Sequence, residues 1–60
     1  MNGQQASTLR RMNGALEQDD PDQRDWIINR AIAELEYTGM TTAEARAETE
    51  RSIGHETVQN

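Results

Sequence analysis

Two helix-start signals and two helix-stop signals alternate along the second half of the chain, and their order constrains the fold more than any other feature. Pro21 suits the first helical position, where its missing N–H needs no partner, and Asp20 with Gln23 can form a capping box around it. Gly39 can adopt the left-handed conformation that ends a helix. These signals predict a helix over residues 21–38.

A second helix is expected to follow after a very short linker. Thr41 and Glu44 are three residues apart, the spacing of a capping box, and Gly54 can close the helix that they start. Residues 42–53 are therefore predicted to be helical, and the short linker makes the two helices antiparallel or steeply crossed neighbours. The predicted contact stripe of this second helix consists of small residues, Ala43, Ala47 and Gly54.

A weaker helix is predicted before the hairpin, over residues 5–18. Leu9, Met12 and Leu16 follow the spacing i, i+3, i+7 and form one narrow apolar stripe, while Gly14 inside the segment lowers its helix propensity. The fold class is accordingly all-α: one small domain over residues 1–60, with a helical hairpin and an N-terminal helix packed against it. The remaining segments, 1–4 and 55–60, are expected to be disordered tails.

The central predicted helix carries apolar residues on two opposite sides. At 100° per residue, one broad side is aliphatic and contains Ile27, Ile28, Ala31, Ile32 and Leu35. The opposite side carries a second set, which we call the aromatic stripe: Trp26, Arg30, Ala33 and Tyr37. Two interpretations are open. Either the central helix contacts one neighbour on each side within a three-helix unit, or the aromatic stripe makes a contact with another molecule.

Composition narrows the classes of function. The 60 residues include eleven acids and six bases, giving a formal net charge of −5, and no cysteine. This balance disfavours wide contact with nucleic acid or with anionic membranes, and no apolar run approaches a membrane-spanning helix. Catalytic and metal-binding patterns are missing from the sequence, so we expect no enzyme, no cofactor and no metal. A cytoplasmic location is the default expectation.

A helix-turn-helix DNA-binding regulator, acting as a dimer, is the alternative to consider. Gly39 stands where such a motif has its turn glycine, and Arg10 with Arg11 could contact phosphates from a dimer. The second helix of the motif would then be residues 42–51, which carry three glutamates against two arginines. That charge has the wrong sign for a groove lined by phosphates. Nucleic acid is therefore an unfavoured partner.

The sequence favours a small non-enzymatic protein-interaction module. The chain is short, has few large apolar residues and can form no disulfide, so its core is small. A second copy or another protein could supply the missing stability. Trp, Tyr and Arg are enriched where interfaces concentrate their binding energy, which favours the aromatic stripe as the contact surface of a homodimer. A small, acidic, lysine-free chain of this kind is also typical of accessory or regulatory proteins of phages and mobile elements.

Overall fold

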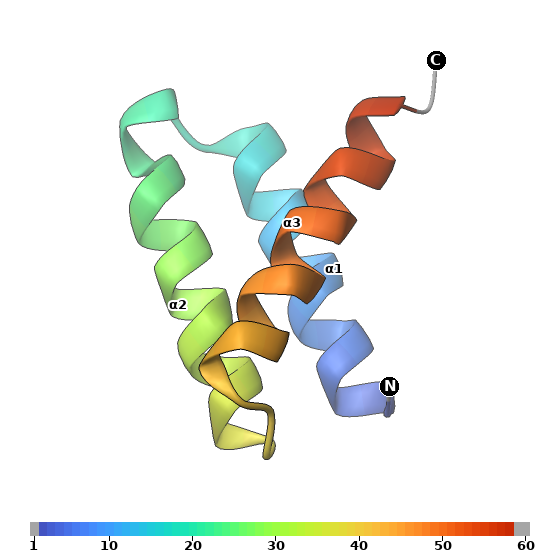
Figure 1. Cartoon of the computed structure of the whole chain (residues 1–60). Helices are drawn as coiled ribbons and strands as arrows, with labels where there is room; N and C mark the ends of the chain where they lie inside the picture. Colours follow the sequence, from blue (N-terminus) through green and yellow to red (C-terminus); the bar gives the residue numbers. More distant parts are fainter. Residues whose placement is uncertain (1, 59–60) are drawn as a thin grey trace.

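The computed structural model describes the backbone of residues 2–58 and the side chains of residues 2–54. Within that range the chain forms three α-helices and one short 3₁₀ turn, and no strand: α1 (Gly3–Gln18), η1 (Pro21–Gln23), α2 (Arg24–Tyr37) and α3 (Thr42–Val58). The helices run up, down and up, so α1 and α3 point the same way and α2 runs against both (Figure 1). The all-α fold predicted from the sequence is confirmed.

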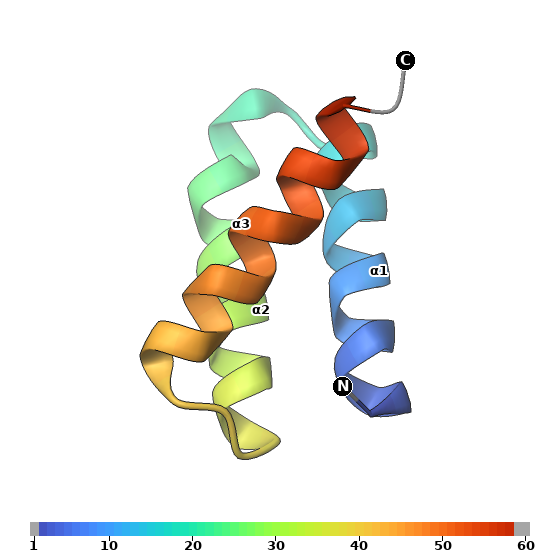
Figure 2. The ribbon, with the colours of Figure 1, turned by 45° about the vertical axis from the view of Figure 1, so that its right-hand side comes forward.

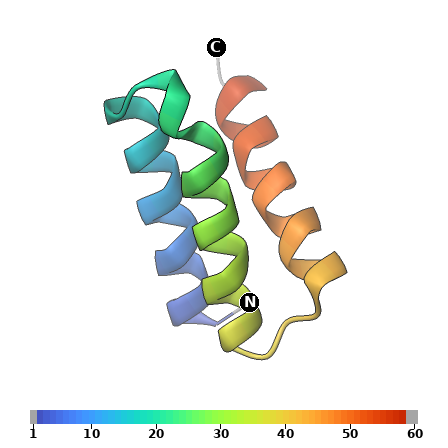
Figure 3. The same ribbon diagram turned by 90° about the vertical axis from the view of Figure 1, so that its left-hand side faces the viewer.

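The core lies where the three helices meet, and α2 makes the largest contribution to it. Each helix contacts the other two, and Figures 2 and 3 show α3 crossing the α1–α2 pair at an angle. The buried apolar residues are Leu9 and Met12 from α1, Ile27, Ala31 and Leu35 from α2, and Ala45 from α3. Leu35 and Ala45 are both fully buried. The aliphatic side of the central helix therefore packs inward, as its periodicity predicted.

Helix α1 begins at Gly3, two residues earlier than predicted. Asn2 accepts a hydrogen bond from the backbone N–H of Gln5 at 2.8 Å, and the Gln5 side chain accepts one from the backbone of Asn2 at 3.1 Å. This is a capping box that the sequence analysis overlooked. Gln5 is buried, and its Nε2 donates to Oγ1 of Thr38 at the end of α2. The first turn of α1 is thus tied to the hairpin, in place of the tail predicted for residues 2–4.

The start of the central helix differs from the prediction. Pro21 does occupy a first-turn position, but Asp20 makes no side-chain capping hydrogen bond. Instead the Asp20 carbonyl accepts a hydrogen bond from the N–H of Gln23 at 2.9 Å, which closes a 3₁₀ turn before α2 begins at Arg24. The capping box predicted for Asp20 and Gln23 is therefore wrong. The backbone supplies the acceptor that the aspartate side chain was expected to supply.

The loop between α2 and α3 follows the prediction closely. Gly39 has φ +112°, a conformation that L side chains rarely adopt, and the N–H of Met40 donates back to the carbonyl of Leu35. Thr41 and Glu44 form the predicted capping box, with distances of 2.9 and 3.1 Å. The Glu44 carboxylate accepts hydrogen bonds from the backbone N–H and the side-chain hydroxyl of Thr41, and these bonds lower the pKa of its carboxyl group.

Helix α3 packs through a different face from the one predicted. Its buried residues are Ala45 and Thr49, whereas Ala43, Ala47 and Gly54 are exposed. The Thr49 hydroxyl donates to the carbonyl of Arg46 at 2.9 Å, so a threonine is buried without an unpaired polar atom. The prediction counted only apolar residues and for that reason missed a stripe that includes a threonine.

Gly54 does not end α3, which continues to Val58. The predicted helix end at residue 53 is therefore wrong, and residues 55–58 of the predicted tail are helical. Of the two predicted tails, residues 1, 59 and 60 lie outside the described part of the chain. A glycine can end a helix by turning left-handed, but Gly54 has no such φ and lies within the helix.

Alanine substitution is expected to act in opposite directions at Gly39 and Gly54. At Gly39, alanine must adopt a left-handed conformation, which costs roughly 1–2 kcal/mol. At Gly54, a Cβ would meet no atom within 4 Å, and alanine should stabilise a helix interior by about 1 kcal/mol. Thermal unfolding followed by circular dichroism measures both effects. A lower melting temperature for Gly54→Ala would show that the helix ends there after all.

Candidate protein-interaction surface

The aromatic stripe lies on the outside of the molecule. Trp26 is 57% exposed and Tyr37 is 89% exposed, and they are the exposed large apolar side chains among those the structure describes. Arg30 and Ala33 between them are exposed as well. Both α1 and α3 pack on the aliphatic side of α2, and no other segment within the described residues covers the stripe. The interpretation in which the stripe contacts a second neighbour within the chain is therefore wrong.

The guanidinium group of Arg30 lies against the indole of Trp26. Its guanidinium carbon lies 5.5 Å from the centre of the Trp26 ring, within the range of a cation–π contact. On its other side the same guanidinium donates from Nε to Oε2 of Glu34 at 3.2 Å. Arg30 and Trp26 are four residues apart in the sequence, a spacing that brings two side chains together on one face of a helix.

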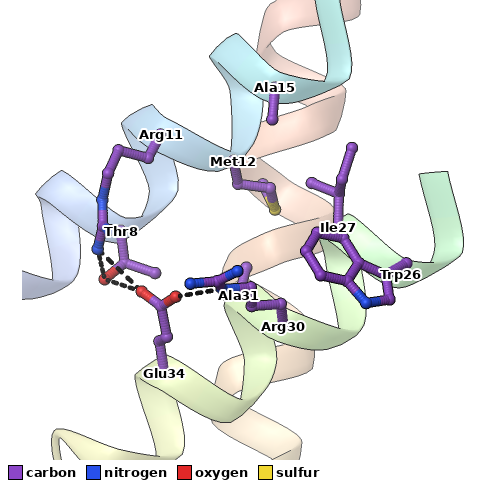
Figure 4. A pocket seen from close by; sticks show the side chains of 9 residues that line it. All are labelled: Thr8, Arg11, Met12, Ala15, Trp26, Ile27, Arg30, Ala31 and Glu34. Atoms are coloured by element: carbon purple, nitrogen blue, oxygen red, sulfur yellow. Dashed lines mark hydrogen bonds and ion pairs between the residues drawn. The ribbon is translucent and has the colours of Figure 1, made fainter. Parts of the chain in front are cut away.

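Glu34 links α1 to α2 beside the stripe. Its Oε1 accepts a hydrogen bond from Nη2 of Arg11 at 2.8 Å, while its Oε2 is bound to Arg30 (Figure 4). The Thr8 hydroxyl lies 3.5 Å from Oε1, a long hydrogen bond. The Arg11–Glu34 pair is largely exposed, so its contribution to stability is small, about 0–1 kcal/mol. Its role is positional, because Glu34 fixes two guanidinium groups at one edge of the stripe.

A shallow groove runs between α1 and α2 beside this network (Figure 4). Its volume is about 170 Å³, below the range of pockets that enclose drug-sized ligands. The groove is lined by apolar residues (Met12, Ala15, Ile27 and Ala31), by Thr8, by the Trp26 ring, and by Arg11, Arg30 and Glu34. Its apolar floor and charged rim are continuous with the aromatic stripe through Trp26 and Arg30. The sequence analysis identified the stripe but not this groove, because the groove depends on how α1 packs against α2.

The two arginines of the DNA-binding alternative have different surroundings. Arg10 is exposed on α1, whereas Arg11 is bound to Glu34 and faces the groove. On α3, Arg51 pairs with Glu48, three residues before it, at 3.5 Å. The arrangement brings Trp26 and Arg30 together with Arg11, and leaves Arg10 apart from them.

Metal-binding groups and membrane-spanning helices can also be assessed in the described part of the chain. No three His, Cys, Asp or Glu side chains gather there as a metal-binding group. No helix in that part combines the length and the apolar character needed to cross a bilayer. Comparison of the chain with protein-family models, with curated proteins and with solved structures gives no match. The candidate function therefore rests on the chemistry of the exposed surface.

Proposed function

We propose that this protein is a small, non-enzymatic protein-interaction module that forms a homodimer through the aromatic stripe of α2. One observation carries the proposal: both aromatic residues of the chain, Trp26 and Tyr37, are exposed on the side of α2 that faces away from the core. Large aromatic residues dominate the energetics of interfaces, and Trp, Tyr and Arg are the types that most often form hot spots.

The composition of the stripe supports self-association. Each copy carries a net charge of −5, so two copies repel each other over most of their surfaces. The stripe itself contains no acid and one arginine, and the groove beside it adds one base and one acid, Arg11 and Glu34. Contact through this surface therefore adds little to the repulsion between the two net charges. Because the remaining repulsion is screened by salt, added salt should strengthen a dimer of this kind.

The double variant Trp26→Ala/Tyr37→Ala is expected to abolish dimerisation and leave the helices intact. Hot-spot residues lose about 2 kcal/mol or more of binding energy on truncation, and each position occurs twice in a homodimer. Sedimentation equilibrium from micromolar to millimolar concentration measures the effect. The wild type should exceed its monomer mass of 6.8 kDa as concentration rises, whereas the variant should remain at that mass. Circular dichroism should show unchanged helicity.

Arg10→Ala/Glu50→Ala is the matched control, because both residues are exposed and lie outside α2. It should dimerise like the wild type. A wild type that stays monomeric at millimolar concentration would contradict the proposal, and so would a control that dissociates as fully as the stripe variant. Loss of helicity in the stripe variant would assign the stripe to folding instead.

The salt dependence of association distinguishes the proposed dimer from the DNA-binding alternative. Binding to duplex DNA weakens steeply as salt rises, because counterions are released from the phosphates. Dimerisation through the stripe should strengthen over the same range. A complex with duplex that forms at low salt and weakens in Arg10→Ala/Arg11→Ala would support the alternative.

A further inference from the structure

The spacing of the aromatic stripe is the same from either end. Trp26, Arg30, Ala33 and Tyr37 are separated by four, three and four residues, and the two aromatic residues stand at the ends. An isologous dimer interface uses the same surface patch on both subunits, so a pattern that repeats itself on reversal suits an antiparallel pair. We infer that α2 packs against α2 of a second copy in antiparallel orientation, with the two-fold axis between Arg30 and Ala33. This inference rests on the proposed function.

This register pairs the two aromatic residues with each other and a long side chain with a short one. A two-fold axis midway between residues 30 and 33 also lies midway between residues 26 and 37, so Trp26 faces Tyr37 of the second copy at both ends of the contact. Near the axis, the long side chain of Arg30 faces Ala33 of the second copy. Alanine leaves space there, and helices in contact approach to about 8–10 Å depending on the side chains between them. The large residues thus meet at the ends and the small residue accommodates the arginine in the middle.

Charge complementarity favours the antiparallel orientation over the parallel one. Glu34 borders the stripe on the side of Arg30, and Asn29 and Glu36 border it on the other side. In an antiparallel pair each border meets the same border of the second copy, as happens along antiparallel coiled coils. Arg30 then lies within one residue of Glu34 of the second copy, and Asn29 lies near Glu36. In a parallel pair the two different borders meet, which brings Glu34 towards Glu36 and creates repulsion.

Glu34 is well placed to pair with Arg30 of the second copy. It already holds Arg30 at 3.2 Å and Arg11 at 2.8 Å within its own chain, so the carboxylate is fixed at the edge of the stripe. In the dimer, Glu34 of each copy lies near Arg30 of the other copy, so acidic and basic groups alternate across the contact. The same arrangement leaves Trp26 at the end of the groove between α1 and α2, where Tyr37 of the second copy can pack against the indole.

The size of the contact sets the expected affinity. Trp and Tyr bury roughly 150–250 Å² each when they are fully covered, and stable complexes bury about 800 Å² per partner. Because Trp26 is 57% exposed and Tyr37 is 89% exposed before contact, the two side chains supply roughly a third of that area, and the remainder must come from Arg30, Ala33 and the bordering residues. This dimer should be weak and should dissociate in the micromolar range.

Single cysteines test the orientation, since the natural chain contains none. With a rise of about 1.5 Å per residue, the two copies of residue 33 lie about 4.5 Å apart along the helices in the antiparallel register, whereas the two copies of residue 22 lie about 28 Å apart. A short bis-maleimide crosslinker should therefore join Ala33→Cys into covalent dimers and leave Asp22→Cys monomeric. Asp22 is exposed and lies in η1, the 3₁₀ turn that precedes α2.

The outcomes distinguish the orientation from the dimer itself. Crosslinking of both variants would indicate a parallel dimer, which overturns the inference and leaves the proposed function standing. A wild type that remains a monomer by sedimentation would overturn the proposed function, and with it the inference. A dimeric wild type in which neither cysteine variant is crosslinked, although both retain wild-type helicity and dimer mass, would show that another surface makes the contact.

Discussion

Replacing Leu35 by alanine is expected to unfold a large fraction of the protein at room temperature. Leu35 is fully buried in the middle of the core. Truncation of a buried leucine costs about 2–5 kcal/mol, because burial is lost and a cavity remains. A 60-residue domain has roughly 3–9 kcal/mol of stability in total. Chemical unfolding followed by circular dichroism should therefore show a lower free energy of unfolding and reduced helicity before denaturant is added.

Leu16→Ala is the matched control for this prediction. It removes the same atoms from a leucine that is only partly buried at the edge of the core. Its effect should be clearly smaller, because the loss scales with the apolar area withdrawn from water and an edge site can be filled by solvent. Equal destabilisation by the two variants would contradict a core centred on Leu35.

Replacing Ala45 by aspartate should destabilise the fold about as strongly. Ala45 is fully buried, and the capping box at Thr41 and Glu44 fixes the turn in which it lies. An unpaired carboxylate at such a site costs several kcal/mol or forces the helix away from its neighbours. The free energy of unfolding from urea titration should fall accordingly. It should recover in part at low pH, where the carboxyl group is protonated and is easier to bury.

Ala47→Asp provides a direct comparison on the same helix. Ala47 is exposed, so aspartate there carries the same loss of helix propensity without burial of a charge. Its effect should lie within about 1 kcal/mol. The pair also decides which face of α3 packs inward. If Ala47→Asp were the more damaging change, the stripe of Ala43 and Ala47 predicted from the sequence would be the buried one.

Local signals in the sequence were sufficient to predict a helix end or a cap where one backbone group or one side chain determines it. Gly39 takes the left-handed conformation, and Thr41 with Glu44 caps α3, because these effects need only residues close in the chain. The same reasoning was wrong at Asp20, where a 3₁₀ turn replaces the side-chain cap, and at Gly54, where the helix continues. A capping residue or a glycine permits a helix end, and the surrounding turn determines whether one forms.

The candidate site was predicted in part. Periodicity alone placed Trp26, Arg30, Ala33 and Tyr37 on one stripe, and the contact between Arg30 and Trp26 follows from their spacing of four residues. The pairing of Glu34 with Arg11 could not be predicted in the same way. Those residues are 23 positions apart, and they meet only because α1 packs against one flank of α2.

The sequence by itself determined that this chain is helical, where its hairpin turns, and which residues of α2 share a side, because helical periodicity and capping act over a few residues. The tertiary structure decided that Trp26 and Tyr37 face solvent and that Ala45 and Thr49 face the core. Both results depend on where the neighbouring helices lie. A helix with two apolar sides can bury either one, and the packing of α1 and α3 on the aliphatic side is what leaves the aromatic stripe available for a partner.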